Sequence, residues 1–210
     1  MRNLHLGKKN MLSLVFAICL LGLNMFTSPL AWAVAIVVPP GFELTEGDNG
    51  QNTAVRDLAR TLQIVYAVSQ LSGLPAGSSI NGMAFRLNGG TDSGPASDRT
   101  WINYDIQFSS SLNPPGSLSS TFAANIGPDV VTVRSGTLTI PGGSFPGGST
   151  PNAFGFLIPF TIPYAYGGGD LLITIRHTGN GVDWAFLDSD IPASVTLYQS
   201  IAADSYDATT

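Results

Sequence analysis

Residues 101 to 110 read "WINYDIQFSS", and this stretch decides the fold class. Its even positions are apolar or aromatic: Ile102, Tyr104, Ile106 and Phe108. Its odd positions are mostly polar: Trp101, Asn103, Asp105, Gln107 and Ser109. A period of two places the two sets on opposite faces of a β-strand. We therefore predict a half-buried strand, with the even set facing the core and the odd set facing outward.

The same alternation recurs along the chain. It is found in "NGMAFRL" (81–87), "DVVTVRSGTLTI" (129–140), "FGFLIPFTI" (154–162), "VDWAFLD" (182–188) and "SVTLYQSI" (194–201). Loops rich in Gly, Pro and Ser separate these segments. Many short strands joined by turns are typical of all-β proteins, so we predict an antiparallel β-sandwich or jelly-roll-like single domain. The inward side chains of the first and last two segments are predicted to be Met83, Phe85, Leu87, Trp184, Phe186, Val195 and Leu197.

Two of these segments carry finer signals. In residues 154–162 the aromatic residues share one face, with Pro159 opposite them and Pro163 just beyond. Because proline cannot donate a hydrogen bond to a ladder, we predict an edge strand or a strand broken by a bulge. In residues 129–140 the apolar residues change from odd to even positions at Ser135-Gly136, which predicts a bulge or a sharp bend there.

Residues 54–71, "AVRDLARTLQIVYAVSQL", fit two structures. A helix would place four apolar residues on one side: Val55, Leu58, Leu62 and Val65. A strand would instead align Leu62, Ile64, Tyr66 and Val68. We favour the strand, followed by a short turn near Ser69.

Residues 1–33 have the features of a signal peptide. A basic start precedes the apolar run "MLSLVFAICLLGLNMF", and "AWA" ends in the pattern of small residues that signal peptidase accepts. A retained membrane anchor is the alternative, because the run approaches the length that spans a bilayer. We expect cleavage after Ala33, which leaves residues 34–210 as one domain, secreted or at the cell surface and free of the membrane. Within it we expect an irregular lead-in at 34–59 and, since no apolar row follows Ile201, a loosely held end at 203–210.

The domain is acidic. Residues 34–210 contain six Arg, no Lys and fourteen Asp plus Glu, a formal charge of −8. Such a surface repels phosphate backbones, so nucleic acid is not an expected partner. The single cysteine, Cys19, lies in the leader, so a packed core rather than a disulfide must stabilise the domain.

Residues 166–177, "YGGGDLLITIRH", contain the single histidine outside the leader. No lysine follows the glycines and a strand rather than a helix comes next, so we interpret "YGGGD" as a hairpin turn and not as a phosphate-binding loop. His177 continues the apolar row of that strand. We predict that it is structural, either packed or bonded to a backbone carbonyl.

Signals for catalysis and for metal binding are weak. The chain has no Gly-x-Ser-x-Gly motif, and one histidine without cysteine cannot supply the usual zinc ligands. Asp183, Asp188 and Asp190 are candidates for a calcium site or for the carboxylate pair of a glycosidase. Asp92 and Asp98 form a second candidate for calcium, while turn formation is the simpler interpretation of both groups. Calcium apart, no cofactor is expected.

Trp101 is the candidate binding residue. The predicted strand places its indole on the polar face beside Asn103 and Asp105. An exposed tryptophan is a large apolar surface that often marks a binding site. Sugars can stack on its ring while Asn103 and Asp105 bond their hydroxyls, unless the preceding loop folds over it. The three residues therefore form a candidate glycan site.

The order of several segments resembles that of a group of exported bacterial proteins that often carry a C-terminal PEP-CTERM sorting signal. These segments are "INGMAFRLNGG", "INYDIQFSSS", "LSSTFAANIGPDVVTVRSGTLTI", an Asn-Ala-Phe strand and "PYAYGGGDLLITIRHTG". The resemblance covers roughly residues 60 to 207 and implies an exported β-sandwich of unassigned activity, associated with the surface or the matrix. The chain departs from the pattern at its end, "AADSYDATT", which leaves simple secretion or a lost sorting signal open.

We expect an exported, non-enzymatic surface or extracellular-matrix protein that contacts extracellular polysaccharide. Two alternatives stay open: a hydrolase that acts on extracellular polysaccharide, and an architectural domain without a ligand. Two carboxyl groups about 5 to 10 Å apart in a cleft would favour the hydrolase. An exposed aromatic platform without such carboxyl groups would favour the binding protein.

Overall fold

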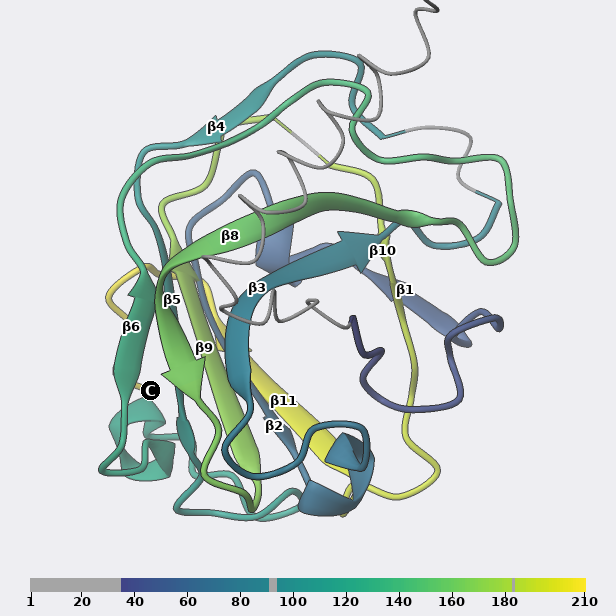
Figure 1. Ribbon diagram of the computed structural model, residues 1–210. Helices are drawn as coiled ribbons and strands as arrows, with labels where there is room; N and C mark the ends of the chain where they lie inside the picture. Colours follow the sequence, from purple (N-terminus) through teal and green to yellow (C-terminus); the bar gives the residue numbers. More distant parts are fainter. Residues whose placement is uncertain (1–34, 91–93, 183) are drawn as a thin grey trace, which may run out of the picture. The chain divides into compact units, whose positions relative to one another are not determined.

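A computed structural model describes residues 35–210, except 91–93 and 183, and residues 36–210 form one unit by their contacts (Figure 1). The strands in this part of the chain are β1 (Asn49–Gln51), β2 (Arg60–Tyr66), β3 (Ser79–Arg86), β4 (Arg99–Trp101), β5 (Tyr104–Ser110), β6 (Val131–Arg134), β7 (Leu138–Ile140), β8 (Phe154–Ala165), β9 (Leu171–His177), β10 (Leu187–Ser189) and β11 (Tyr198–Ala203). Three single-turn 3-10 helices accompany them: η1 (Thr53–Val55), η2 (Val68–Leu71) and η3 (Phe122–Asn125). The predicted all-β fold is confirmed.

The largest sheet has five antiparallel strands in the order β11-β2-β9-β5-β6. Its central strand β9 is buried on both faces from Leu171 to Ile175, which explains its nearly continuous apolar sequence. The neighbours keep a regular register with it, for example Leu62 opposite Ile175 and Ile106 opposite Ile175 on the other side. The strand interpretation of residues 60–66 is therefore confirmed, with η2 as the turn after it.

A second layer, in which β3 pairs with β8, packs on one face of this sheet (Figure 1). Phe108 of β5 contacts the rings of Phe160 and Tyr164 of β8, with centroids 5.2 and 5.6 Å apart. A bridge between Leu87 and Leu187 continues this layer into β10, which pairs with β1. The result is a β-sandwich-like arrangement with one apolar core between the layers.

The proline-containing strand β8 behaves as predicted. It pairs on one side only, with β3, and the pairing register shifts twice along its length.

The loop that follows β8 is not a hairpin, because β8 and β9 lie in different sheets. The hairpin prediction for "YGGGD" is wrong: these residues carry the chain from one layer to the other, and Gly168 and Gly169 both adopt positive φ there.

The predicted bend at Ser135-Gly136 is confirmed. Gly136 has a φ of 92°, and the chain leaves the five-stranded sheet there, because β7 pairs with β4 and not with β5.

A break that the sequence pattern did not indicate lies between β4 and β5, at Ile102 and Asn103. The break shifts the alternation by one residue, so Trp101 and Tyr104 both point inward, while Ile102 is 67 % exposed.

Three side chains near the C-terminus that were predicted to face the core do not. Phe186 and Val195 are 55 % and 59 % exposed, and Leu197 is half-buried. The chain turns at residues 195–197, and the strand begins only at Tyr198, so the alternation seen in the sequence does not correspond to a strand there. Trp184 and Leu87 are buried as predicted, and Met83 and Phe85 are partly buried against the core.

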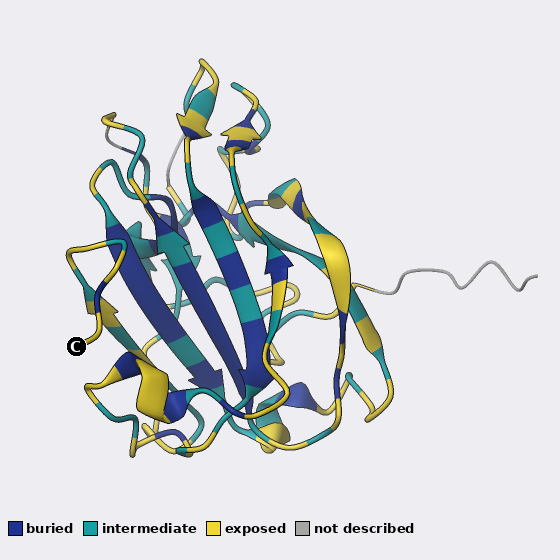
Figure 2. Ribbon diagram, turned by 90° about the vertical axis from the view of Figure 1, so that its left-hand side faces the viewer, coloured by how far each residue is buried: buried dark blue, intermediate teal, exposed yellow. Residues whose placement is uncertain are grey.

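Much of the outer face of the five-stranded sheet is also buried, although several of its residues are polar (Figure 2). Gln63 and Thr174 are 0 % and 2 % exposed and bond each other at 3.1 Å. Gln63 also donates to the carbonyl of Phe122 and accepts from Asn125, both in η3. The η3 loop therefore covers this face through hydrogen bonds.

The C-terminal segment covers the same face, so the prediction of a loosely held end at 203–210 is wrong. Thr61 and Arg176 donate to backbone carbonyls of residues 205, 206 and 208, and the N–H of Phe122 donates to the carbonyl of Thr209. Tyr206 donates its hydroxyl to Asp105. The segment needs no apolar row, because polar groups of the sheet bind its backbone.

We predict that Asn125→Ala lowers the free energy of unfolding by about 2 to 4 kcal/mol, because it leaves the buried Gln63 Oε1 and the backbone of Ser119 unpaired. Urea denaturation measures the change. The control Asn81→Ala removes an exposed amide of β3 and should alter stability by less than about 0.5 kcal/mol. Equal effects of the two substitutions would contradict the role given to Asn125.

Candidate functional site

The structure does not place the proposed glycan platform at the surface. The Trp101 side chain is fully buried, and its Nε1 donates to the carbonyl of Arg56 at 3.2 Å. Its ring packs against Tyr104 and Trp184, with centroids 5.7 Å away in both cases. The prediction of an exposed indole is wrong, because the break at residues 102–103 turns Trp101 toward the core.

The two polar partners of that platform have structural contacts of their own. Asp105 accepts hydrogen bonds from the N–H of Gly136 at 3.1 Å and from the Tyr206 hydroxyl. The backbone of Asn103 is bonded to Thr178: its carbonyl accepts from the Thr178 N–H at 3.2 Å, and its N–H donates to the Thr178 hydroxyl at 3.4 Å. Neither residue lies beside an exposed indole, so these three residues do not form a sugar-stacking surface.

The predicted calcium ligands have separate contacts. Asp188 pairs with Arg86, Asp190 accepts from the Tyr198 hydroxyl, and Asp183 lies outside the described residues. In the second candidate, Asp98 accepts from the N–H of Gly142 at 2.9 Å, and Asp92 again lies outside the described residues. Among the residues that the structure describes, no group of three His, Cys, Asp or Glu side chains is placed to hold a metal ion.

His177 has the structural contacts that its position in the strand predicts. Its side chain is fully buried, and its ring is stacked with that of Tyr104 at 5.6 Å. Nδ1 accepts from the N–H of Gly179 at 3.2 Å, so the proton is on Nε2, which lies 3.0 Å from the carbonyl of Thr53. Burial lowers the pKa of His177, and the nearby Arg60 charge lowers it further, against the opposing effect of the Thr53 carbonyl.

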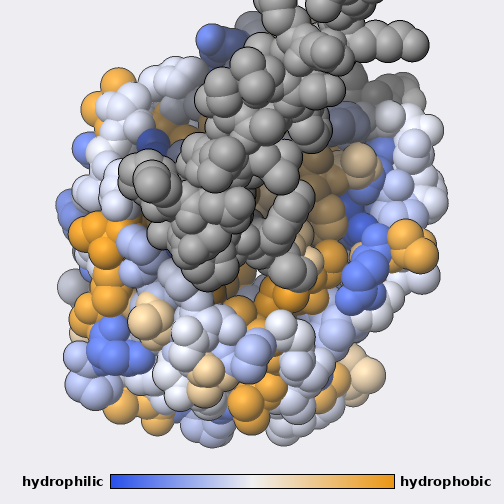
Figure 3. Space-filling view, in the orientation of Figure 1, coloured by the Kyte–Doolittle hydropathy of each residue, from blue (hydrophilic) through white to orange (hydrophobic). Residues whose placement is uncertain are grey.

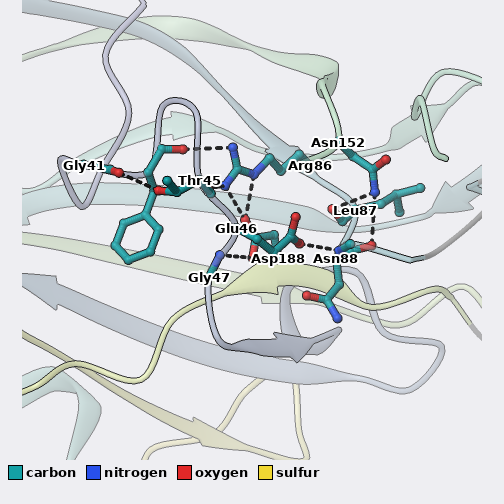
Figure 4. Close-up of polar contacts among 11 residues, drawn as sticks. Gly41, Thr45, Glu46, Gly47, Arg86, Leu87, Asn88, Asn152 and Asp188 are labelled. Carbon is teal, nitrogen blue, oxygen red and sulfur yellow. Dashed lines mark hydrogen bonds and ion pairs between the residues drawn. The ribbon is translucent and has the colours of Figure 1, made fainter. Parts of the chain in front are cut away.

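A buried ion pair joins the second layer to the lead-in at residues 41–47 (Figure 4). Arg86 ends β3, and Asp188 lies across from it in β10; their side chains are 5 % and 7 % exposed and come within 2.5 Å. Arg86 also donates to the carbonyls of Phe42 and Thr45, at 2.9 and 2.5 Å. Asp188 accepts from the N–H of Gly47 at 3.0 Å. These bonds bind a segment without regular structure to the sheet.

Two other polar side chains extend this Arg86 cluster. Glu46 accepts from the N–H of Gly89 through Oε1, while its buried Oε2 has no hydrogen-bond partner among the described residues. Asn152 donates to the carbonyls of Leu87 and Asn88 at 3.2 and 3.1 Å (Figure 4). The backbone of residues 86–89 is therefore held from both sides.

Beside the cluster an exposed phenyl ring, an amide and a glycine lie together. The N–H of Asn88 donates to the carbonyl of Phe186 at 2.9 Å, and Phe186 is 55 % exposed. A Cβ on Gly50 would lie 2.9 Å from Asn88 Nδ2 and 3.1 Å from the Phe186 Cβ, so both side chains lie against the glycine and leave no room for a larger residue there. We call Phe186, Asn88 and Gly50 the Phe186 surface.

A second exposed ring lies on the other side of Arg86. Phe154 is 43 % exposed, it pairs with Arg86 across β3 and β8, and the guanidinium lies 5.4 Å from its ring centroid. In the orientation of Figure 1, apolar residues outside the grey atoms are interspersed with polar ones over the visible face (Figure 3). Exposed aromatic rings thus flank the cluster on both sides.

Sequence reasoning missed this cluster. The alternation of "NGMAFRL" places Arg86 on the outward face, opposite Met83, Phe85 and Leu87, but it gives no partner for its charge. The partner is 102 residues away in the chain and was interpreted as a calcium ligand. Phe186 was expected to face inward, but it is exposed, and its neighbour Leu187 is buried instead.

We predict that Asp188→Ala lowers the free energy of unfolding by about 3 to 5 kcal/mol, because it leaves the buried Arg86 charge unpaired. Thermal and urea unfolding measure the loss. The double variant Arg86→Met with Asp188→Leu has no unpaired charge and should recover part of it, although the carbonyls that Arg86 binds then lack a donor. A single variant as stable as the wild type would contradict the role of the pair.

His177 gives the unfolding free energy a dependence on pH. Because its pKa is lower in the folded protein than the ordinary 6.5, the unfolded chain binds a proton that the folded chain does not. Stability is complete above 6.5 and decreases as pH falls below it, by at most about 1.4 kcal/mol per pH unit. Urea titrations between about pH 8 and pH 5 test this. His177→Gln should remove that slope; an unchanged slope in the variant would assign it to other groups.

No family model matches the chain, and neither a curated protein nor a solved structure matches it. Within the described residues, no helix is long and apolar enough to cross a membrane. The expectations that rest on the leader and on the resemblance to exported bacterial proteins therefore stay predictions.

Proposed function

We propose that the protein is an exported, non-enzymatic surface or extracellular-matrix protein that contacts polysaccharide through the Phe186 surface. The observation that carries this proposal is the exposed Phe186 ring, whose Cβ lies with the Asn88 amide against Gly50. This surface takes the place of the Trp101 platform, whose indole is buried.

The Phe186 surface has the chemistry of a sugar contact. The C–H face of a sugar ring packs on an aromatic ring, and a nearby amide can bond its hydroxyls. The side-chain amide of Asn88 has no hydrogen-bond partner among the described residues, so it is available to a ligand. The missing side chain at Gly50 lets the Asn88 amide and the base of the Phe186 side chain lie close together.

The surface is also rigid, which reduces the entropy that binding would cost. Its backbone is fixed by the bridge between Leu87 and Leu187 and by the bond from Asn88 to Phe186. The buried pair of Arg86 and Asp188 holds the same two strands together one residue further along. A ligand would therefore meet side chains that are already in place.

Charge favours neutral over anionic polysaccharides. The formal charge of residues 34–210 is −8, and Glu46, Asp48 and Asp188 lie in or beside the strands of this surface. An anionic polymer would be repelled at low ionic strength. We therefore propose uncharged extracellular polysaccharide as the partner.

The hydrolase alternative has less support, because the nearest carboxyl groups already serve the fold. Asp188 is ion-paired with Arg86 and bonded to Gly47, and Glu46 Oε1 accepts from Gly89. A glycosidase needs two carboxyl groups that are free to exchange protons and to attack the sugar or water. No observation favours a purely architectural domain over the binding protein.

The proposal predicts that a panel of soluble neutral and anionic polysaccharides contains neutral polymers that retard the protein in affinity electrophoresis. Phe186→Ala should remove the retardation, because it removes the stacking ring. Gly50→Ala should weaken it, because its Cβ displaces the Asn88 amide. The control Ile162→Ala removes an equally exposed apolar residue of β8, 54 % exposed, and should bind like the wild type.

Two results would refute this proposal. The first is that no polysaccharide of the panel retards the wild-type protein. The second is that Phe186→Ala and Ile162→Ala are retarded equally, which would place the contact elsewhere.

A further inference from the structure

Strand β11 is an unusual edge. It is the outermost strand of the five-stranded sheet and pairs on one side only, with β2 (Figure 1). The opposite edge of that sheet, β6, lies against β8, where the Thr161 hydroxyl donates to the carbonyl of Val133 at 3.0 Å. The edge strand β8 carries Pro159 and Pro163, and β1, β4, β7 and β10 have only three residues each.

The sequence of β11, "YQSIAA", lacks every feature that protects an edge. It has no charge, no proline and no glycine, and its six residues pair with β2 without a register shift. Natural proteins protect free edges with lysine, proline, bulges or very short strands. Among the described strands, β11 is the long edge without such protection.

The pairing with β2 determines which backbone groups point outward. The N–H of Ala67 donates to the carbonyl of Leu197, and the register places Leu197 opposite Ala67, one step before Tyr198 opposite Tyr66. In an antiparallel ladder, bonded residues alternate with residues that point the other way. Odd residues of β11 therefore bond to β2, and Tyr198, Ser200 and Ala202 direct N–H and C=O away from the sheet.

We propose that β11 is the docking edge for a second copy of this chain, joined antiparallel about a two-fold axis at Ser200. In this register Ser200 exchanges both backbone bonds with Ser200 of the other copy, and Tyr198 does so with Ala202. Each outward N–H thereby meets an outward C=O. Two five-stranded sheets become one sheet of ten strands.

The side chains suit this self-pairing. Tyr198 lies opposite Ala202, a large side chain beside a small one, and Gln199 lies opposite Ile201, so no like charges oppose each other. An uncharged strand has nothing to attract a charged peptide. When β11 of a second copy lies antiparallel to this one, its outward N–H and C=O groups meet the outward C=O and N–H groups of the first copy. This match favours a second copy as the occupant.

The overall charge sets the salt dependence of the dimer. Two copies that each carry −8 in residues 34–210 repel at long range, while the edge itself is neutral. Salt screens the repulsion without weakening the backbone bonds. Association should therefore strengthen as NaCl is raised. This inference does not depend on the glycan proposal.

Sedimentation equilibrium of the protein, purified in the form that the expression host processes, tests the proposal. The wild type should show a monomer–dimer equilibrium that shifts toward dimer with NaCl. Ser200→Pro removes the outward N–H at the axis but no bond to β2, and it should lower the association constant at least about tenfold. Ser200→Lys, which keeps the N–H but places two like charges side by side, should do the same.

Asn81→Lys, at an exposed position of β3, is the control and should associate like the wild type. Thermal unfolding identifies a variant that fails to fold, and the lysine variant then replaces the proline variant. A wild type that stays monomeric at all concentrations and salts would overturn the proposal. A dimer that both Ser200 variants leave intact would overturn it too, since its interface would lie elsewhere.

Discussion

The constraint on which the rest of the structure depends is that β9 must be covered on both faces. Leu171, Ile173 and Ile175 face the second layer, while Leu172 and Thr174 face the other way, and all are buried. A parallel sheet has both faces covered by helices, whereas an antiparallel sheet such as this one commonly leaves one face to solvent. Here one cover is an apolar layer of strands, and the other is a pair of loop segments held by polar groups.

The polar cover explains why buried amides and hydroxyls occur in this sheet. Each loop segment carries backbone groups that need partners once they leave water. Gln63, Thr61 and Arg176 supply those partners from β2 and β9, and Asn125 connects the η3 loop back to Gln63. A fully bonded polar network of this kind specifies one arrangement of the cover, because any other would leave buried groups unpaired. No cysteine lies in residues 34–210, so these bonds and the core must do what disulfides do in many exported domains.

The fold could be predicted from the sequence where a strand is long and uninterrupted. Tyr104, Ile106, Phe108 and the row ending at His177 are buried as their alternation predicts. Trp101 was misplaced because the break at Ile102 and Asn103 contains neither glycine nor proline. The firm hold on the C-terminal segment could not be predicted, because Thr61 and Arg176 bind backbone carbonyls, which leave no pattern in the sequence. Nor does alternation within single strands indicate that Arg86 and Asp188, 102 residues apart, share one buried site.

The Phe186 surface and the β11 edge together suggest how a small surface could serve in a matrix. One phenyl ring and one amide make a small contact, far below the area of a stable protein interface, so a single site would bind a polysaccharide weakly. A two-fold dimer through β11 would carry two such sites. A polysaccharide with repeating units can occupy both, and the second contact then forms at high effective concentration. Retention on a polymer would thus arise from pairing of two weak sites rather than from a deep pocket, and the proposed matrix protein would stay attached while individual contacts exchange.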